Sequence, residues 1–207
     1  MTINLNIQAE IIHLCYDTPQ QQDIFLVDTN VWLWQTYSQI ASARTIKKIQ
    51  AYTPYIKKAR THGATLVYSG LIFAELTHVI EKTELSIYNE RTKSKLTQKE
   101  YRHNYPKERD NVIAAVESAW KQVESLAIPI DLTVNDQTTH AALSRFQRQA
   151  LDGYDLLLLE AISQSGSGQI KVITDDMDYS VVPNIQVFTN NGLVIQQATQ
   201  QRKLLVR

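Results

Sequence analysis

Four groups of acidic residues have mainly apolar neighbours in the sequence: Asp28, Glu75, Asp155, and the cluster of Asp175, Asp176 and Asp178. A carboxylate among apolar side chains is costly to bury unless a cation pairs with it or binds it. Carboxylates that converge also repel one another, and a divalent cation relieves that repulsion. Hard oxygen ligands favour Mg²⁺ or Mn²⁺, and such an ion can activate water for in-line attack on a phosphodiester.

The expected secondary structure brings these acids to one edge of a sheet. Residues 24–27 and 170–173 are short apolar runs rich in β-forming residues, so each predicts a buried strand. Asp28 directly follows the first run, and Asp175 comes shortly after the second. Strands and helices alternate along most of the chain, which predicts a mainly parallel sheet with right-handed crossovers. The functional crevice of such a sheet lies beyond the carboxyl ends of its strands.

The remaining pattern predicts a three-layer α/β/α sandwich with a sheet of about four or five strands. Further strands are expected at 64–68, 128–132 and 184–188. Helices are expected just after Asn30, at about 41–61, from Gly70 through Ile80, at about 110–126, from Asn135 to about Gln149, and at 155–163.

Each acid also has a purely structural explanation. Asp28 could be only the N-cap of the helix that follows it, and Asp155 could cap its own helix. Glu75 could be solvated, or paired with a Lys or Arg. The cluster at 175–178 could be a turn, because Asp is common in turns. One such acid would be weak evidence, whereas four in this order are much harder to explain in this way.

Length and composition are those of a single globular domain. The chain has 207 residues, 43% of them apolar and 20% charged, and its 21 basic and 21 acidic residues cancel, which excludes a histone-like polycation. The single cysteine, Cys15, excludes a disulfide within the chain, and neither a secretory signal nor a membrane-spanning run is found. We therefore expect a cytoplasmic protein. Residues 1–22 are expected as an N-terminal extension that packs on a domain of residues 23–207, with a polar insertion at about 83–110.

The acids lie in four short motifs that resemble those of the PIN-domain nucleases, the family that includes the VapC-type toxins. The motifs are FLVDTNV at 25–31, FAEL at 73–76, YDLLLLEA at 154–161 and VITDDMDY at 172–179. The resemblance implies that one or two Mg²⁺ or Mn²⁺ ions are bound by Asp28, Glu75, Asp155 and Asp176. It further implies that Asp178 assists, and that the site is supported by Thr29, Asn30 and Thr174.

This resemblance implies a PIN-like fold and a metal-dependent endoribonuclease that hydrolyses RNA phosphodiester bonds. It also implies a homodimer and, if the chain is the toxin of a toxin–antitoxin pair, a small antitoxin protein as its partner. One alternative is a catalytically inactive PIN-like module that binds RNA or serves as a scaffold, although all four acids are present. Another is a phosphatase of related topology, but such an enzyme would have a second Asp where Asn30 stands.

Basic residues are concentrated in two blocks that could bind a phosphate backbone. Residues 29–74 contain six basic and no acidic residues, and residues 91–109 contain seven basic and two acidic residues. The predicted RNA contacts in the second block are Lys93, Lys95, Lys99 and Arg102, and the tyrosines that could stack on bases are Tyr88, Tyr101 and Tyr105. A solvated charged face is the alternative. Trp32 and Trp34 are expected to pack in the core, or one of them to line a substrate groove or a dimer surface.

Overall fold

The apolar runs predicted as strands form the centre of a parallel sheet. In the computed structural model, which describes residues 3–40, 43–164 and 169–207, β2 (Ile24–Val27) lies between β3 (Thr65–Tyr68) and β5 (Ile170–Ile173). The described strands have the order β4-β3-β2-β5-β6-β1-β7, and every neighbouring pair is parallel. The other strands are β4 (Ile128–Pro129), β6 (Ile185–Thr189), β1 (Glu10–His13) and β7 (Leu204–Leu205). The α/β class is confirmed, and the sheet of the described residues has seven strands rather than four or five.

The N-terminal segment belongs to the sheet itself. β1 lies between β6 and β7, where Ile11 is the register partner of Val187 on one side and of Leu204 on the other. Ile11 and Ile12 are almost fully buried. A pair of apolar residues is too short a pattern to predict a strand. Residues 1–22, expected as an extension packed on the domain, therefore contribute a strand inside the sheet.

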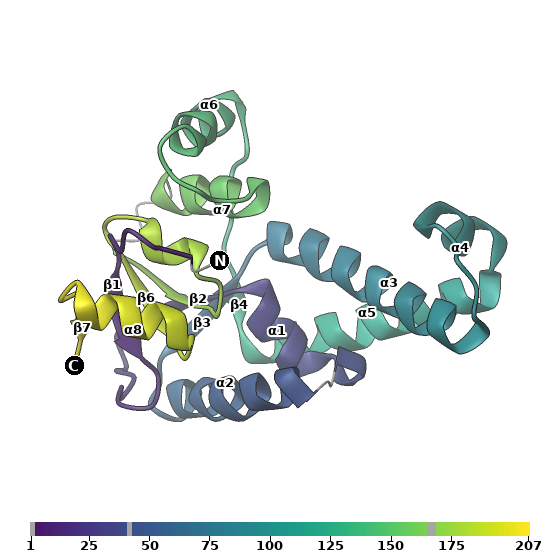
Figure 1. Cartoon of the computed structure of the whole chain (residues 1–207), viewed down its shortest axis with the longest axis horizontal. Helices are drawn as coiled ribbons and strands as arrows, with labels where there is room; N and C mark the ends of the chain where they lie inside the picture. The colour runs from purple at the N-terminus through teal and green to yellow at the C-terminus, as the bar shows by residue number, and fades with distance from the viewer. Residues whose placement is uncertain (1–2, 41–42, 165–168) are drawn as a thin grey trace.

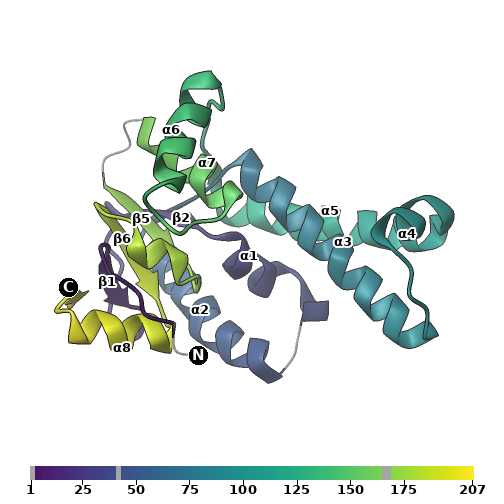
Figure 2. The same cartoon turned by 45° about the horizontal axis from the view of Figure 1, so that its top comes forward.

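Helices cover both faces of the sheet, and α2 and α7 lie on opposite sides of it in both views (Figures 1 and 2). One layer contains α1 (Thr29–Thr36), α2 (Ala43–Thr61), α3 (Gly70–Thr92) and α5 (Pro106–Leu126), together with the short η1 (Ser38–Ile40). Right-handed crossovers place on the other face α6 (Asp136–Phe146), α7 (Gly153–Gln164) and α8 (Gly192–Gln200). Asn135, expected at the start of a helix, caps α6. No helix in the described ranges is long and apolar enough to cross a membrane.

The segment predicted as a polar insertion forms the outer part of a helical arm. α3 and α5 run side by side away from the sheet, and α4 (Gln98–Asn104) packs at their far end (Figures 1 and 2). The rings of Tyr88, Tyr101 and Tyr105 contact one another there, with centroids 5.4 to 6.5 Å apart. Tyr101 is only 1% exposed. These rings thus form the core of the arm tip, and the prediction that Tyr101 stacks on RNA bases is wrong.

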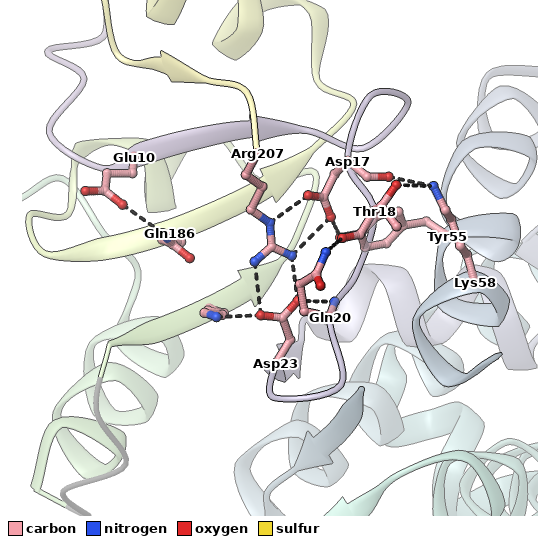
Figure 3. A network of polar contacts seen from close by, with 10 residues as sticks. Glu10, Asp17, Thr18, Gln20, Asp23, Tyr55, Lys58, Gln186 and Arg207 are labelled. Atoms are coloured by element: carbon pink, nitrogen blue, oxygen red, sulfur yellow. Dashed lines mark hydrogen bonds and ion pairs between the residues drawn. The ribbon is translucent and has the colours of Figure 1, made fainter. Parts of the chain in front are cut away.

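A buried polar network lies at the amino end of β2, the end opposite the predicted site (Figure 3). Arg207 binds Asp17 through Nε at 2.6 Å and Asp23 through Nη2 at 2.6 Å. Asp17 also accepts a hydrogen bond from the Tyr55 hydroxyl, and Asp23 accepts one from Lys171 of β5 at 2.5 Å. Both aspartates are 1% exposed. This Arg207 network ties the C-terminal segment to the loop before β2 and to β5.

Candidate active site

Asp28 stands where β2 ends, next to the end of β5. Its backbone N–H donates to the Ile173 carbonyl at 3.0 Å, and the Thr174 hydroxyl donates to its carboxylate at 2.7 Å. Asp28 is 5% exposed, and Thr174 is fully buried. Asp28 occupies the N-cap position of α1, but its side chain makes no capping hydrogen bond. The N-cap alternative therefore does not explain this carboxylate, and Thr174 contacts it as a supporting residue would.

Glu75 reaches the same edge of the sheet from α3. The hydroxyl of Thr29, the first residue of α1, donates to the Glu75 carboxylate at 2.6 Å. Among the residues that the structure describes, no Lys, Arg or His forms an ion pair with Glu75. The side chain is half-buried. Glu75 is thus neither freely solvated nor neutralised by a described basic residue.

Asp155 lies in the first turn of α7 without capping that helix. The capping residue is Asp152, whose carboxylate accepts the N–H groups of Tyr154 at 2.9 Å and Asp155 at 3.1 Å. The Asp155 carboxylate accepts the hydroxyl of Tyr179 at 2.5 Å, and Tyr179 is fully buried. Asp152 is therefore the N-cap of α7, and helix capping does not explain the presence of Asp155.

Asp152 adds an acid to the site that is not among the predicted site residues. Its side chain is exposed. Nevertheless, its charge contributes to raising the pKa of Glu75, Asp155 and Asp178, so it lies near all of them at the rim of the site. The sequence contained a usable indication, because an Asp that directly precedes an apolar helix is typical of an N-cap.

Asp176 and Asp178 follow β5 and complete the acidic group. The Asp176 N–H donates to the Thr174 hydroxyl at 2.8 Å, so Thr174 joins Asp176 to Asp28. The Asp178 N–H, at the first residue of the short helix η2 (Asp178–Val181), donates to the Asp176 carboxylate at 2.9 Å. The Asp176 carboxylate therefore does stabilise a turn, as the structural alternative for this cluster proposed. The same turn keeps Asp176 beside Asp28, because both contact Thr174.

Asp175 takes part in a different set of contacts. Its carboxylate binds Lys48 of α2 at 2.5 Å and accepts the Tyr52 hydroxyl at 2.8 Å. Asp175 lines a groove together with Asn30, the predicted support residue, which is half-buried. Asp175 thus has a basic partner, whereas no ion pair among the described residues includes Asp176.

Burial and mutual repulsion raise the pKa of the site carboxyl groups. Burial is the largest cause at Asp28, and the charges of Glu75 and Asp176 add to it, so that its pKa rises to about 7. Burial and then the charge of Asp28 raise the pKa of Asp155 to about 8. The pKa of Glu75 and that of Asp178 also rise, again mainly through burial. Carboxylates from four parts of the chain thus repel one another in one shared site.

The donor chemistry of this site fits a hard divalent cation. All the candidate ligands are carboxylates, the ligand type that Mg²⁺ and Mn²⁺ favour. Each hydroxyl donor described above occupies one oxygen of its carboxylate, and a carboxylate has lone pairs beyond those that one hydrogen bond uses. Within the described ranges, however, no three His, Cys, Asp or Glu side chains are already closed around one ion position. Ion binding would therefore require these carboxylates to move closer together.

The four predicted RNA-binding residues lie at the tip of the arm and differ in their contacts. Lys93, Lys95 and Lys99 are exposed. Arg102 instead forms a bidentate ion pair with Glu81, a buried residue of α3. The Arg102 Nε atom lies 2.7 Å from the Glu81 carboxylate. Arg102 therefore fastens α4 to α3, a structural role that the basic pattern of this segment does not indicate.

Comparison with known proteins adds a distant structural likeness. No protein-family model and no curated protein matches the chain. Among solved structures, the chain is similar to a crystal structure of VapBC2 from Rickettsia felis bound to a DNA fragment from their promoter. The match has 14% sequence identity and a TM-score of 0.47, and it covers 80% of this chain and 98% of that chain. A likeness at this level does not place the chain in a family.

Proposed function

We propose that the protein is a metal-dependent endoribonuclease whose active site is the carboxylate group at the ends of β2 and β5. The observation that carries the proposal is that carboxylates from separate elements meet there without basic partners. In the described part of the chain, no ion pair includes Asp28, Glu75, Asp155, Asp176 or Asp178. Buried acids that repel one another destabilise a fold. Binding of a divalent cation is the function that accounts for their presence.

The residues that would hold one or two Mg²⁺ or Mn²⁺ ions are Asp28, Glu75, Asp155 and Asp176, with Asp178 assisting. When bound, the ion lowers the pKa of a water molecule and stabilises the negative charge that develops on the phosphate. Three hydroxyl groups of the chain orient these ligands: Thr174 holds Asp28, Thr29 holds Glu75, and Tyr179 holds Asp155. Each of these hydrogen bonds restricts the rotamer of the carboxylate that accepts it.

A polynucleotide substrate is supported by the distribution of basic residues. Lys93, Lys95 and Lys99 are exposed on the arm, which projects away from the sheet (Figure 1). Contacts that far from the reacting group suit a long polyanion rather than a small phosphomonoester. The arm would thus hold an RNA strand by its backbone while the carboxylate site cuts it.

The test is cleavage of a mixed pool of structured and single-stranded RNA with Mn²⁺ or Mg²⁺. We expect cleavage by the unmodified protein, and no cleavage with EDTA, with Asp28→Asn or with Glu75→Gln. The matched controls are Asp110→Asn and Glu117→Gln, which change exposed acids of α5 in the same chemical way. Full activity in a folded Asp28→Asn protein would refute the assigned site.

Two other functions predict different results in the same experiment. An inactive RNA-binding or scaffold module would bind the pool without cutting it, at any concentration of Mn²⁺. A phosphatase would release phosphate from a phosphomonoester and leave internal RNA bonds intact. The raised pKa values of Asp28 and Asp155 favour an occupied metal site over an inactive module, because a scaffold has no use for repelling buried acids.

The antitoxin partner and the homodimer implied by the PIN-domain resemblance stay predictions. A toxin role predicts that induced expression arrests growth of a bacterial host, and that Asp28→Asn abolishes the arrest. Light scattering of the purified chain measures whether it forms a dimer. If growth is unaffected although RNA is cut in vitro, the nuclease function stands and the toxin role is refuted.

A further inference from the structure

A groove opens directly beside the carboxylate site. It has a volume of about 320 Å³, and its lining residues are Asn30, Trp34, Thr45, Lys48, Asp175, Asp176, Met177 and Asn191. Asp176 belongs both to this lining and to the acidic site, so the two share a wall. A chain that crosses the site can therefore continue into the groove.

Lys48 is the one basic residue among those that line the groove. It binds both carboxylate oxygens of Asp175, at 2.5 and 2.7 Å, while its side chain stays 24% exposed. Asp175 is in turn fixed by the Tyr52 hydroxyl at 2.8 Å, and its carbonyl accepts the Asn191 amide at 2.7 Å. Lys48 is thus held in place at the groove by a rigid partner. Its ammonium group still has hydrogen-bonding capacity toward a second anion.

The charge of Lys48 has the sign that a bound nucleic acid needs at this point. A phosphate backbone that reaches the acidic site meets several carboxylates, which repel its phosphates. Lys48 comes from the stretch 29–74, which has no acidic residue, and it brings a positive charge next to Asp176. A cation in this groove would neutralise a phosphate bound there.

Trp34 provides an aromatic surface in the same groove. Its ring is half-buried, and it contacts the Tyr52 ring at a centroid distance of 5.3 Å. Tyr52 is 1% exposed, so it supports the indole from the core side. Trp32, in contrast, is fully buried. Stacking on an anchored aromatic ring binds any base, because every base has a flat face.

We propose that this groove is a subsite for the nucleotide next to the bond being cut, in which Lys48 pairs with a backbone phosphate and Trp34 stacks on the base. The inference rests on the proposed nuclease function for the identity of the ligand. It goes beyond that function because it assigns substrate contacts to residues of α1 and α2. Neither helix contains any of the site acids, since Asp28 directly precedes α1. The substrate class is single-stranded RNA, since a paired base has no free face to offer Trp34.

The test measures RNA binding apart from cleavage. A short fluorescein-labelled single-stranded RNA of mixed sequence is titrated with Asp28→Asn protein without divalent cations, and anisotropy gives Kd at several salt concentrations. Lys48→Met and Trp34→Leu are added to that background. The matched control is Lys47→Met, because Lys47 is the adjacent residue of α2, is exposed and does not line the groove. The double variant Lys48→Met with Asp175→Asn removes the ion pair without leaving Asp175 as an unpaired charge.

We expect Lys48→Met to raise Kd about 5- to 10-fold and to reduce the slope of log Kd against log salt by roughly 0.7, the value for one phosphate contact on a single strand. Trp34→Leu is expected to raise Kd by about 5-fold or more without changing the slope. Lys47→Met should change Kd by less than about 2-fold. Equal effects of Lys48→Met and Lys47→Met would overturn the subsite. So would normal binding by the double variant, because the loss would then come from the unpaired Asp175.

Cleavage of the same RNA by the unmodified protein with Mn²⁺ separates this inference from the proposed function. If binding depends on Lys48 and Trp34 but the RNA is not cut, the subsite stands and the nuclease function fails. If the RNA is cut while Lys48→Met binds it normally, the nuclease function stands and the subsite is overturned. Absence of any RNA binding overturns the subsite as well.

Discussion

Asp28 and Asp155 are the two acids whose ionisation the fold changes most. Their pKa values rise to about 7 and about 8, chiefly because both are buried. Thr174 and Tyr179 each donate one hydrogen bond that favours the ionised form, but burial outweighs both. In the metal-free protein these acids therefore ionise only near neutral pH, and their ionisation opposes folding.

The first prediction concerns Asp28→Asn in the metal-free protein. The folded pKa of Asp28 lies above its ordinary value of 3.8, so its contribution to stability falls as pH rises from about 4 to about 7. Asparagine can still accept the Thr174 hydrogen bond but carries no charge. Asp28→Asn should therefore raise Tm at pH 8, with each kcal/mol of relief worth roughly 2–4 °C in a chain of this size.

Thermal unfolding at pH 5 and at pH 8, with EDTA, checks this prediction. The gain in Tm should be larger at pH 8, because Asp28 of the unmodified protein is largely protonated at pH 5. Asp110→Asn, on the exposed side of α5, is the control and should leave Tm nearly unchanged. A lower Tm for Asp28→Asn at pH 8 would show that the charged form is stabilised without metal, contrary to the expectation.

The second prediction concerns Tyr179, which we assign as a positioning residue for Asp155. Tyr179→Phe keeps the buried ring and removes the hydroxyl that donates at 2.5 Å. The Asp155 carboxylate then loses a hydrogen bond that lowers its pKa, so its ionised form becomes less favourable. The concentration of Mn²⁺ for half-maximal RNA cleavage should rise by about 10-fold or more, as for loss of other contacts that orient a metal ligand.

The pH profile distinguishes positioning from a simple loss of stability. Cleavage by Tyr179→Phe should reach its maximum at a higher pH than cleavage by the unmodified protein, because Asp155 needs a higher pH to ionise. Tyr16→Phe is the control, since Tyr16 is 76% exposed. If Tyr179→Phe lowers Tm but leaves the Mn²⁺ requirement and the pH profile unchanged, the hydroxyl only stabilises the fold.

At the scale of elements, the arm separates basic residues that look alike in the sequence. α4 is attached to α3 by Arg102, and Arg109 of α5 approaches the same Glu81 at 3.4 Å. Glu81 is 5% exposed, so it needs these partners. Lys93, Lys95 and Lys99 at the tip are exposed, and no ion pair among the described residues includes them. The arm therefore has a structural ion-pair group along its length and a free basic surface at its end.

The third prediction follows from this division. Replacing Lys93, Lys95 and Lys99 together with Gln should weaken RNA binding and reduce the slope of log Kd against log salt by about 2, with little change in Tm. Arg102→Gln should lower Tm, because Glu81 loses its two-pronged partner, and should leave the salt slope nearly unchanged. Anisotropy titrations and thermal unfolding of both variants check the contrast. If the triple variant leaves the salt slope intact, the lysines form only a solvated face.

At the scale of the whole molecule, the two ends of β2 have opposite electrostatics. Asp28 at the carboxyl end has a raised pKa. At the amino end, burial alone would raise the pKa of Asp23, but hydrogen bonds from Arg207 and Lys171 hold it far below its usual range. Ionisation of Asp28 at one end of β2 therefore destabilises the fold, whereas ionisation of Asp23 at the other end stabilises it. The Arg207 network lies at the amino end of β2, away from the candidate site (Figure 3).

The fourth prediction concerns acid unfolding. Because the folded pKa of Asp23 is depressed, its contribution to stability is present above about pH 4 and is lost as pH falls further. Arg207→Met removes its largest favourable partner and leaves Asp17 and Asp23 buried with fewer donors. The variant should therefore have a lower Tm at pH 7 and should unfold at a higher pH on acid titration. Circular dichroism measures both, with the exposed Lys203→Met as control.

A clear result would contradict this assignment. If Arg207→Met unfolds at the same pH as the unmodified protein, the network does not contribute to acid stability. The effects of Asp28→Asn and Arg207→Met should also add, since the two groups lie at opposite ends of the strand and share no partner. Strong non-additivity would mean that the two ends of β2 are coupled through the sheet.

Part of the site could be predicted because local sequence determines it. The apolar runs at 24–27 and 170–173 form strands, and the acids that follow them lie at adjacent strand ends. Asn135 caps α6 through contacts within the first turn. Such features depend on neighbours a few residues away, so periodicity and capping preferences are sufficient to find them.

The partners of the site residues, in contrast, lie far along the chain. Thr29 donates to Glu75, Tyr179 donates to Asp155, and Lys48 forms an ion pair with Asp175. No local pattern contains these pairs, because each depends on how two separate elements pack. The same holds for Arg102, whose basic type suggested RNA and whose position joins it to Glu81.

By itself, the sequence determined the α/β class, the central strands and the acids at their ends, since these follow from short-range periodicity and from the crossover rules of parallel sheets. Only the tertiary structure decided that β1 enters the sheet between β6 and β7, that the polar segment extends α3 and α5 into an arm, and which carboxylates are buried together. The physical reason is that strand pairing over long sequence separations, and the burial that shifts a pKa, arise from contacts that form only when the whole chain has folded.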